Sequence, residues 1–313
     1  MSAERYDIVA LGEPMVEFNQ TRGGEKDSYL FGFGGDTSNM AIAAARLGAR
    51  VAYVTRVGDD AFGRRLLELW RSEGVETRGV GVDADAATGV YFVSHGAAGH
   101  EFSYLRAGSA ASRMRPAELP LELVCRARVL HASAISQAIS ASACDTVFAA
   151  IDAARKAGAK VSYDTNLRLK LWPLPRARAI VKASLALADW ALPSLDDAKL
   201  LFEREDIDSV IDACHEAGAP LVVLRCGGEG CVVSDARRRE RIHAQRVEVL
   251  DATGAGDCFD GAFAVRILAG DDPVAAARYA NAAAALATTG YGAVAPLPRH
   301  AQVEALLGKR VAA

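Results

Sequence analysis

The chain has 313 residues, 51% of them hydrophobic, and a formal net charge of −3 at pH 7. This length predicts one large domain, or one domain with a small appendage, and the apolar share is enough for a sizeable core. The absence of a long basic run argues against nucleic acid as a partner, and no uninterrupted apolar run reaches the roughly 18 residues that a membrane span needs.

The cysteines and the first residues indicate a cellular compartment. Six cysteines are scattered along the chain and none forms a C-x-x-C pair. Scattered cysteines in a chain of this size favour a reducing environment over a disulfide framework. The segment Met1–Tyr6 lacks the apolar stretch of a signal peptide. We therefore expect a cytoplasmic protein.

The first part of the chain alternates between strand and helix patterns. Residues 7–11 form a short apolar run that reads as a buried strand, and residues 40–47 have helical spacing. Residues 51–57 read as the next strand and residues 62–73 as an amphipathic helix. This alternation predicts a mostly parallel sheet with crossover helices on both faces.

Two other segments have the period-2 pattern of a small, half-exposed sheet. Strands are expected from about 13–33 and 80–106, the second pair as a hairpin, inserted into a single domain that spans 1–313. A sheet of two to four strands cannot bury both of its faces alone. We expect one face to cover the active site, and the exposed remainder to pair with a second subunit in a homodimer or a higher homo-oligomer.

The second half of the chain continues the alternation. Strands are expected at 128–134, 160–163, 190–192, 220–224 and 245–250, and helices at 143–156, 176–188, 207–216, 260–269 and 273–288. His131 falls inside the first of these strands. We interpret it as a core histidine rather than a metal ligand, because no other histidine has metal-binding spacing.

A first glycine-rich turn precedes a helix at Gly34, Gly35, Asp36 and Asn39. Glycines allow a ligand to approach the backbone closely, and carboxylate and amide groups suit sugar hydroxyls. A plain strand-to-helix turn with an Asx cap is the alternative, and the stretch taken alone favours that alternative.

A second turn, Asp251–Asp257, contains Gly254, Ala255 and Gly256 before another helix. Glycines there, with the free N–H groups and positive dipole end of the helix, predict a phosphate site. A carboxylate in an anion site repels the ligand, so its presence requires a functional reason. Accepting a proton from a hydroxyl that attacks the phosphate is such a reason. The helix dipole would favour the ionised form of Asp257 and make it a weak base. The alternative is that Asp257 only caps the helix.

Other motifs narrow the function. The chain has no G-x-x-x-x-G-K-[ST] P-loop and no complete G-x-G-x-x-G after a strand, which disfavours a dinucleotide dehydrogenase. The glycine-rich segment 225–231 fits a turn under a nucleotide and a plain hairpin turn equally well. A polyhydroxy site and an anion site with a base together indicate a small-molecule kinase. A non-catalytic sensor is the alternative, which Asp257 argues against.

On these two signatures the sequence resembles the ribokinase-like (PfkB) carbohydrate kinases, from about Asp7 to Leu297. The resemblance implies a three-layer α/β fold with a small β-sheet lid, and it implies ATP and Mg²⁺, with K⁺ in many members. It implies that Asp257 is the catalytic base and that the turn Gly254, Ala255 and Gly256 stabilises the phosphoryl group. It further implies nucleotide-binding residues at Ser194, Arg225, Gly227, Gly228, Gly230, Gly254, Gly256, Asn281 and Gly292, a water-mediated Mg²⁺ contact at Asp197, and K⁺ near Asp251 and Thr253.

Departures from the family pattern concern the metal site. Ala252 replaces the usual threonine, and Ser194-Leu195-Asp196-Asp197 stands where the family often has N-x-x-E. Ser194 therefore replaces an amide, while Asp197 can still orient metal-bound water.

The basic and aromatic residues near the predicted site indicate the class of substrate. A sugar acid has a carboxylate that favours a forked arginine, and Arg106 and Arg168 fall in loops that should face the site. Tyr91 and Tyr104 add hydroxyl groups. With the segment Tyr104–Ala110, this set is most similar to the 2-keto-3-deoxygluconate kinase subgroup. The sugar-acid substrate would be phosphorylated by ATP on its primary hydroxyl, and a neutral sugar such as fructose or ribose is the alternative.

Overall fold

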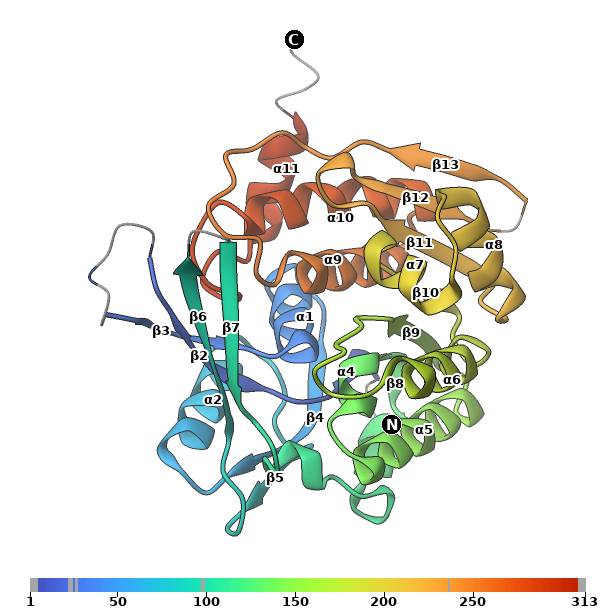
Figure 1. Ribbon diagram of the computed structural model, residues 1–313. Coiled ribbons are helices and arrows are strands. Elements are labelled where there is room, and N and C mark those ends of the chain that lie inside the picture. The colour runs from blue at the N-terminus through green and yellow to red at the C-terminus, as the bar shows by residue number, and fades with distance from the viewer. Residues whose placement is uncertain (1–4, 22–24, 26–27, 97–98, 236, 309–313) are drawn as a thin grey trace.

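The computed structural model describes residues 5–21, 25, 28–96, 99–235 and 237–308, and within them a nine-stranded sheet forms the centre of the chain (Figure 1). Its order is β13-β12-β11-β10-β9-β8-β1-β4-β5, and every pairing is parallel except the two that β12 makes. The strands are β1 (Tyr6–Leu11), β4 (Val51–Gly58), β5 (Val80–Asp83), β8 (Ala127–Ser133), β9 (Lys160–Asp164), β10 (Trp190–Ala191), β11 (Leu221–Arg225), β12 (Cys231–Ser234) and β13 (Arg239–Ile242).

Helices cover both faces of this sheet, which gives the expected three layers. One apolar core lies under α1 (Asp36–Arg46), α2 (Ala61–Ser72), α9 (Ala255–Ala269), α10 (Pro273–Ala287) and α11 (His300–Gly308). The core on the other face lies under α3 (Leu121–Val124), α4 (Ala134–Ala138), α5 (Ala141–Lys156), α6 (Leu174–Leu185), α7 (Leu195–Phe202) and α8 (Ile207–Glu216). Short 3-10 turns are η1 (Ala111–Arg113), η2 (Pro116–Glu118) and η3 (Gly227–Glu229). Within the described ranges, no helix has the length and hydropathy of a membrane span.

A separate four-stranded sheet forms the lid, on the left of Figure 1. Its order is β3 (Leu30–Gly34), β2 (Met15–Asn19), β6 (Gly89–Gly96) and β7 (Gly99–Leu105). The small second sheet is therefore confirmed. The expected start of its second segment near residue 80 is wrong, because Val80–Asp83 pairs with β4 at the edge of the main sheet.

Three other expectations have clear outcomes. Residues 245–250 are not a strand, since β13 already forms that edge and the backbone of Leu250 bonds to Thr288 on the loop after α10. The helix expected from residue 260 begins at Ala255, because the glycine turn is itself its start. His131 is a core histidine, as expected. It is buried beside the Ser162 hydroxyl at 3.1 Å, and burial lowers its pKa to about 4.

Candidate active site

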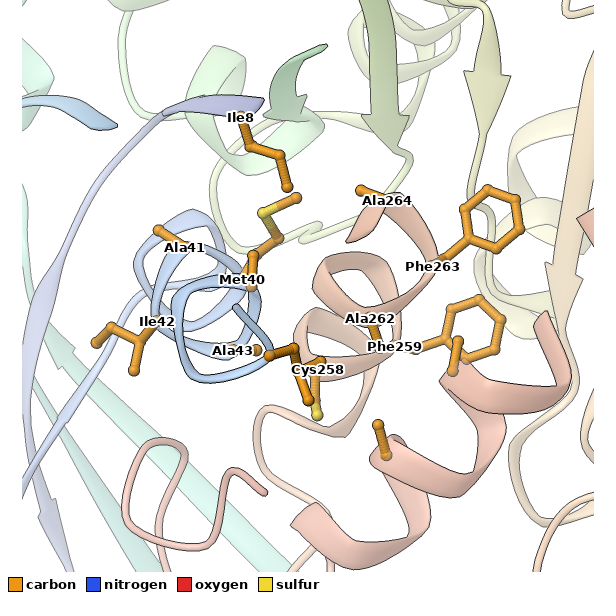
Figure 2. Packing of buried hydrophobic residues seen from close by; sticks show 14 of the residues in the cluster. Ile8, Met40, Ala41, Ile42, Ala43, Cys258, Phe259, Ala262, Phe263 and Ala264 are labelled. Atoms are coloured by element: carbon orange, nitrogen blue, oxygen red, sulfur yellow. The ribbon is translucent and has the colours of Figure 1, made fainter. Parts of the chain in front are cut away.

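The two glycine-rich turns meet through a pair of helices, α1 and α9. Gly261 on α9 allows close packing, since a Cβ there would lie 2.8 Å from the backbone oxygen of Met40. Figure 2 shows Met40 and Ala43 of α1 facing the side of α9 that carries Cys258 and Ala262. Small side chains at this contact bring residues that are distant in the sequence within bonding distance.

That contact positions Asp257. The amide nitrogen of Asn39 on α1 lies 2.8 Å from Oδ2 of Asp257 on α9 and donates to it. Asp257 is the third residue of the helix, and the N-cap is Gly254, which has no side chain to cap with. The capping interpretation of Asp257 is therefore wrong. Its carboxylate faces α1 instead of the helix's own N–H groups.

The turn before Asp257 leaves the end of α9 open. Gly254 has φ +77°, and a Cβ there would lie 2.9 Å from the carbonyl oxygen of Ala293. Only glycine fits this combination of backbone angle and close contact. Because the first N–H groups of an α-helix have no partner within the helix, this uncapped end can receive an anion such as a phosphate.

Burial and neighbouring carboxylates govern the ionisation of Asp257. Burial raises its pKa to about 7, and the charges of Asp36 and Asp164 act in the same direction. The Asn39 hydrogen bond and the charge of Arg225 oppose this rise. The expectation of a weak base with a dipole-lowered pKa is therefore wrong, because loss of solvation outweighs the helix dipole. The Asp257 carboxyl group therefore changes its ionisation near neutral pH.

Asp36 is the first residue of α1 and also faces this region. Its carboxylate accepts hydrogen bonds from the Ser133 hydroxyl, from the Thr37 backbone at 2.8 Å and from the Asn166 amide at 3.5 Å. Burial raises the pKa of Asp36. The N-cap of α1 is Gly35 at φ +100°, so the Asx-cap alternative for this turn is also wrong.

The lid supplies two buried carboxylates that the sequence patterns did not reveal. Glu17 on β2 accepts a hydrogen bond from the Tyr91 hydroxyl, and Glu13, in the connection between β1 and β2, pairs with Arg106 and accepts from Ser109. The side chain of Arg106 is 8% exposed and that of Glu13 is fully buried. Arg106 was expected to be a free cation for the substrate, but much of its charge is already neutralised. Only the tertiary structure reveals this, because Glu13 is 93 residues from Arg106.

Tyr104 lies where the lid meets a loop of the main domain. Its ring stacks with Tyr91 at 6.1 Å between centroids, and the Arg106 guanidinium lies 5.6 Å from its centre. Lys170 lies 5.9 Å from the same ring and donates to the Phe102 carbonyl at 3.2 Å. Arg168 is exposed on the same loop as Lys170. The structure thus brings together Tyr91, Tyr104 and Arg106 and adds Lys170, whereas Arg168 bonds to the Leu167 carbonyl at 2.8 Å.

Several polar atoms beside Asp36 and Asp257 have no partner. Asn39 Oδ1, Arg106 Nε and Thr165 Oγ1 are buried and lack a hydrogen bond among the described residues. Buried polar atoms are rarely left unpaired in folded proteins. A ligand with several hydroxyl groups, bound as the lid moves, would pair with such atoms.

Of the residues expected to bind the nucleotide, some lie in an open turn and others make structural contacts. Gly227 and Gly228 lie in the open hairpin turn between β11 and β12, which confirms the hairpin interpretation of that segment. Gly230 is structural, since a Cβ would clash with the carbonyl of Ile242. Asn281 on α10 donates to that same carbonyl at 3.3 Å.

Arg225 is buried under the start of α9. It forms ion pairs with Asp164 at 2.5 Å and Asp260 at 2.9 Å. Arg225 was expected to bind the nucleotide, and in this structure its guanidinium pairs with these carboxylates instead.

Ser194 caps α7 by accepting from the Asp197 backbone at 3.3 Å, and Asp197 accepts from the Leu167 backbone at 3.0 Å. Burial raises the pKa of Asp197. Hard oxygen donors of this kind suit Mg²⁺, which favours the charged carboxylate. No cluster of three or more His, Cys, Asp or Glu side chains able to hold a metal occurs in the part of the chain that the structure describes.

Asp251 does not fit K⁺ in this arrangement. Its Oδ1 accepts from the backbone and the hydroxyl of Thr253, at 2.9 and 2.6 Å. Its Oδ2 accepts from the Asn19 amide at 3.0 Å and from the Gly292 backbone at 2.9 Å. Four donors saturate the four lone-pair sites of a carboxylate, which leaves none for a cation.

Comparisons with known proteins agree with this geometry. The model of the pfkB family carbohydrate kinases matches residues 6–300. The chain is 35% identical to fructokinase-1 of Zea mays, over 99% of this chain and 100% of that protein. It is also 35% identical to the 2-dehydro-3-deoxygluconokinase of Thermoproteus tenax, over 96% of this chain and 94% of that protein. The crystal structure of a ribokinase II from E. coli with ATP and Mg²⁺ superposes with a TM-score of 0.90 at 26% identity, covering 97% and 99% of the two chains.

Proposed function

The chain belongs to the pfkB family of carbohydrate kinases, and on that premise we propose that it phosphorylates the primary hydroxyl of 2-keto-3-deoxygluconate with ATP. The product would be 2-keto-3-deoxy-6-phosphogluconate. The observation that carries the sugar-acid assignment is the group of cations around Tyr104. Glu13 neutralises Arg106, and Lys170 and Arg168 remain to receive a carboxylate.

Asp257 would act as the general base. With a pKa of about 7, its carboxyl takes up the proton of the attacking hydroxyl near neutral pH. Asn39 holds one of its oxygens, which leaves the other to face the substrate. The proton moves to that oxygen as the hydroxyl oxygen bonds to the γ-phosphorus and the bond to the ADP oxygen breaks.

The start of α9 would stabilise the transferred group. The N–H groups that follow Ala255 would donate to the negative charge on the equatorial oxygens of the phosphoryl group, since the N–H of Ala255 itself bonds to the Ala252 carbonyl at 3.2 Å. The lid strands exclude water from this region when they cover the sugar. Bound Mg²⁺ supplies charge neutralisation on the ATP phosphates, and Asp197 is the residue that would hold it through water.

A kinase for a neutral sugar is the second candidate. It is favoured by the pairing of Arg106 with Glu13, which reduces the positive charge that a sugar acid requires. The similarity to fructokinase-1 of Zea mays supports it as well, because its 35% identity equals that of the 2-dehydro-3-deoxygluconokinase of Thermoproteus tenax.

The test is an ADP-release assay with Mg-ATP on 2-keto-3-deoxygluconate, fructose and ribose. We expect kcat/KM to be at least about tenfold higher for the sugar acid, the effect of one charge-assisted contact. A higher kcat/KM for fructose or ribose would contradict the sugar-acid proposal and support a kinase for a neutral sugar. Both outcomes keep Asp257 as the base.

We also propose a cytoplasmic location, on the ground that all six cysteines are unpaired. A homodimer or higher homo-oligomer formed through the lid sheet is the proposed assembly. Its support is the apolar surface of the lid, where Tyr29 is 39% exposed and Leu30 is 50% exposed.

A further inference from the structure

Arg225 connects α9 to the carboxyl ends of the neighbouring strands. It is the last residue of β11, and its Nη1 donates to Asp260 on the second turn of α9 at 2.9 Å. Its Nη2 donates to Asp164, the last residue of β9, at 2.5 Å and to the carbonyl of Leu192 after β10 at 2.7 Å. One guanidinium therefore joins a helix to three parallel strands.

The same guanidinium lies directly against the phosphate-binding turn. A Cβ placed on Gly256 would be 2.9 Å from Nη1 of Arg225, so the glycine gives the guanidinium its space. Gly256 is one of the residues that form the uncapped end of α9, and Asp257 follows it. A displacement of Arg225 would therefore displace the N–H groups and the base together.

The environment of Asp257 contains more carboxylates than cations. The ionisable groups that face it from the surrounding elements are Asp36 on α1, Tyr91 on β6, Asp164 on β9, Arg225 on β11, and Cys258 and Asp260 on α9. Arg225 is the cation in this set. It balances the Asp164 and Asp260 pair, and it lowers the pKa of Asp257 against the effects of burial and of Asp36.

We propose that Arg225 is a positioning residue that fixes the start of α9, and with it Asp257, relative to the carboxyl ends of the strands. This inference rests on the proposed function, because it assigns Arg225 a role in the same phosphoryl transfer. The role differs from a ligand contact, since the guanidinium acts through Gly256 and Asp260. It also differs from general stabilisation, which makes it testable.

The experiment compares Arg225→Met and Arg225→Lys with Arg46→Met. Arg46 is the matched control, because its side chain is also 12% exposed and is also paired with a carboxylate, that of Glu73. For Arg225→Met we expect kcat to fall roughly 100-fold, the size of effect that a displacement of about 1 Å produces, while KM for the sugar changes little. The acid limb of the pH profile of kcat/KM should move to higher pH, because the cation that favours ionised Asp257 is gone. Arg46→Met should leave that limb where it is.

Arg225→Lys keeps the positive charge but loses the planar guanidinium that donates to Asp164 and Asp260 together. We expect its acid limb to remain at the wild-type position, with a kcat between those of wild type and Arg225→Met. Because Arg225→Met leaves two buried carboxylates unpaired, the double variant Arg225→Met/Asp260→Asn is included to preserve folding. We expect the same loss of kcat in it, but an acid limb near the wild-type position, because the cation and one of the neighbouring anions are removed together.

Two results would overturn the role of Arg225. One is a kcat in the double variant equal to that of Arg46→Met. The other is an Arg225→Lys variant whose acid limb shifts as far as that of Arg225→Met. If the wild type turned over no sugar, the proposed function would fail separately. A calorimetric titration with Mg-ATP would then decide, since the proposal predicts weaker binding in Arg225→Met, and affinity equal to that of Arg46→Met would refute it.

Discussion

At the scale of single residues, the proposed reaction depends on the ionisation of Asp257. It lies at a helix start, where an anion is stabilised, yet burial and the charges of Asp36 and Asp164 raise its pKa to about 7. Within the part of the chain that the structure describes, the Asn39 amide is the group that bonds to it directly. The proposed base is therefore a carboxyl group that ionises near neutral pH.

Replacing Asp257 with asparagine tests its role as the base. The amide keeps the shape of the side chain but cannot accept a proton, so we expect kcat to fall by roughly 10²–10⁴-fold. Circular dichroism should show an unchanged fold. Asp208→Asn, at an exposed position on α8, is the control and should retain full activity. Turnover in Asp257→Asn near the wild-type value would remove the base from the mechanism.

The pH dependence follows from the raised pKa. We expect kcat/KM to rise with pH and to level off above about 7, as Asp257 loses its proton. Glu17, whose pKa burial also raises to about 7, could produce the same limb. A Glu17→Gln variant that still shows the limb would assign it to Asp257, and one that lacks it would reassign it.

The raised pKa of Asp257 also predicts how stability depends on pH. An ordinary ion-paired aspartate makes the folded state less stable as the pH falls, whereas Asp257 makes it less stable as the pH rises. The folded-state pKa of about 7 lies above the ordinary aspartate value of 3.8, so folding favours the protonated form. This contribution to the free energy of unfolding is present below pH 4 and is lost as the pH rises to about 7. Asp257→Asn should therefore have a higher Tm than wild type at pH 8 and a similar Tm near pH 4.

Arg168 is predicted to bind the substrate carboxylate. It is exposed on the loop that reaches the lid through Lys170. We expect Arg168→Ala to raise KM for a sugar acid by at least about tenfold, with little change in KM for ATP, since a charge-assisted hydrogen bond is lost. Steady-state kinetics with each substrate varied would measure this. Equal increases in both KM values would contradict a carboxylate contact.

At the scale of elements, the contact between α1 and α9 sets the geometry of the site. α1 carries Asp36 and Asn39, α9 carries Asp257, and the helices approach closely because Gly261 and several alanines lie between them (Figure 2). Interiors are packed too densely to absorb an added methyl group without movement.

Gly261→Val should therefore separate the two helices. Its Cβ would lie 2.8 Å from the Met40 oxygen and 3.1 Å from the Ala44 nitrogen, both backbone atoms that cannot move aside alone. We expect a loss of roughly 1–3 kcal/mol in the free energy of unfolding and a fall in kcat as Asn39 moves away from Asp257. Urea denaturation and kinetics would measure the two effects. Gly308→Ala, in a helix with open space around the residue, should show neither.

At the scale of the whole molecule, the lid sheet joins the main domain at the carboxyl ends of the strands, and one of its faces carries partly buried aromatic rings that pack against the core under α2. Aromatic rings of β2, β3 and β6 pack together there, including Phe18 with Phe31 and with Phe92. Tyr29 extends this group to the surface. Such a surface is typical of a protein–protein contact.

We expect the 33.0 kDa chain to sediment as a dimer or larger assembly. The double variant Tyr29→Ser/Leu30→Ser should dissociate at concentrations where the wild type remains assembled, because it removes exposed apolar area from the lid. Analytical ultracentrifugation over a dilution series would measure this. A monomeric wild type, or a variant that assembles as well as the wild type, would exclude the lid as the interface.

The sequence by itself determined the α/β class, the lid as a separate small sheet, and the two glycine turns that precede α1 and α9. These features depend on local chemistry: apolar periodicity, the backbone freedom of glycine, and the free N–H groups at a helix start. Such signals are complete within a few neighbouring residues. The strand expected at 245–250 failed because strand formation also requires a partner, which periodicity cannot show.

The tertiary structure decided what each charged side chain does. Glu13 partly neutralises Arg106 from 93 residues away, and Asp164 and Asp260 hold Arg225 beneath Gly256 instead of leaving it for a nucleotide. Asp257 acquired its raised pKa from burial and from carboxylates on other elements. Electrostatic energies depend on distance in space and on exclusion of water, and folding sets both by bringing distant segments together.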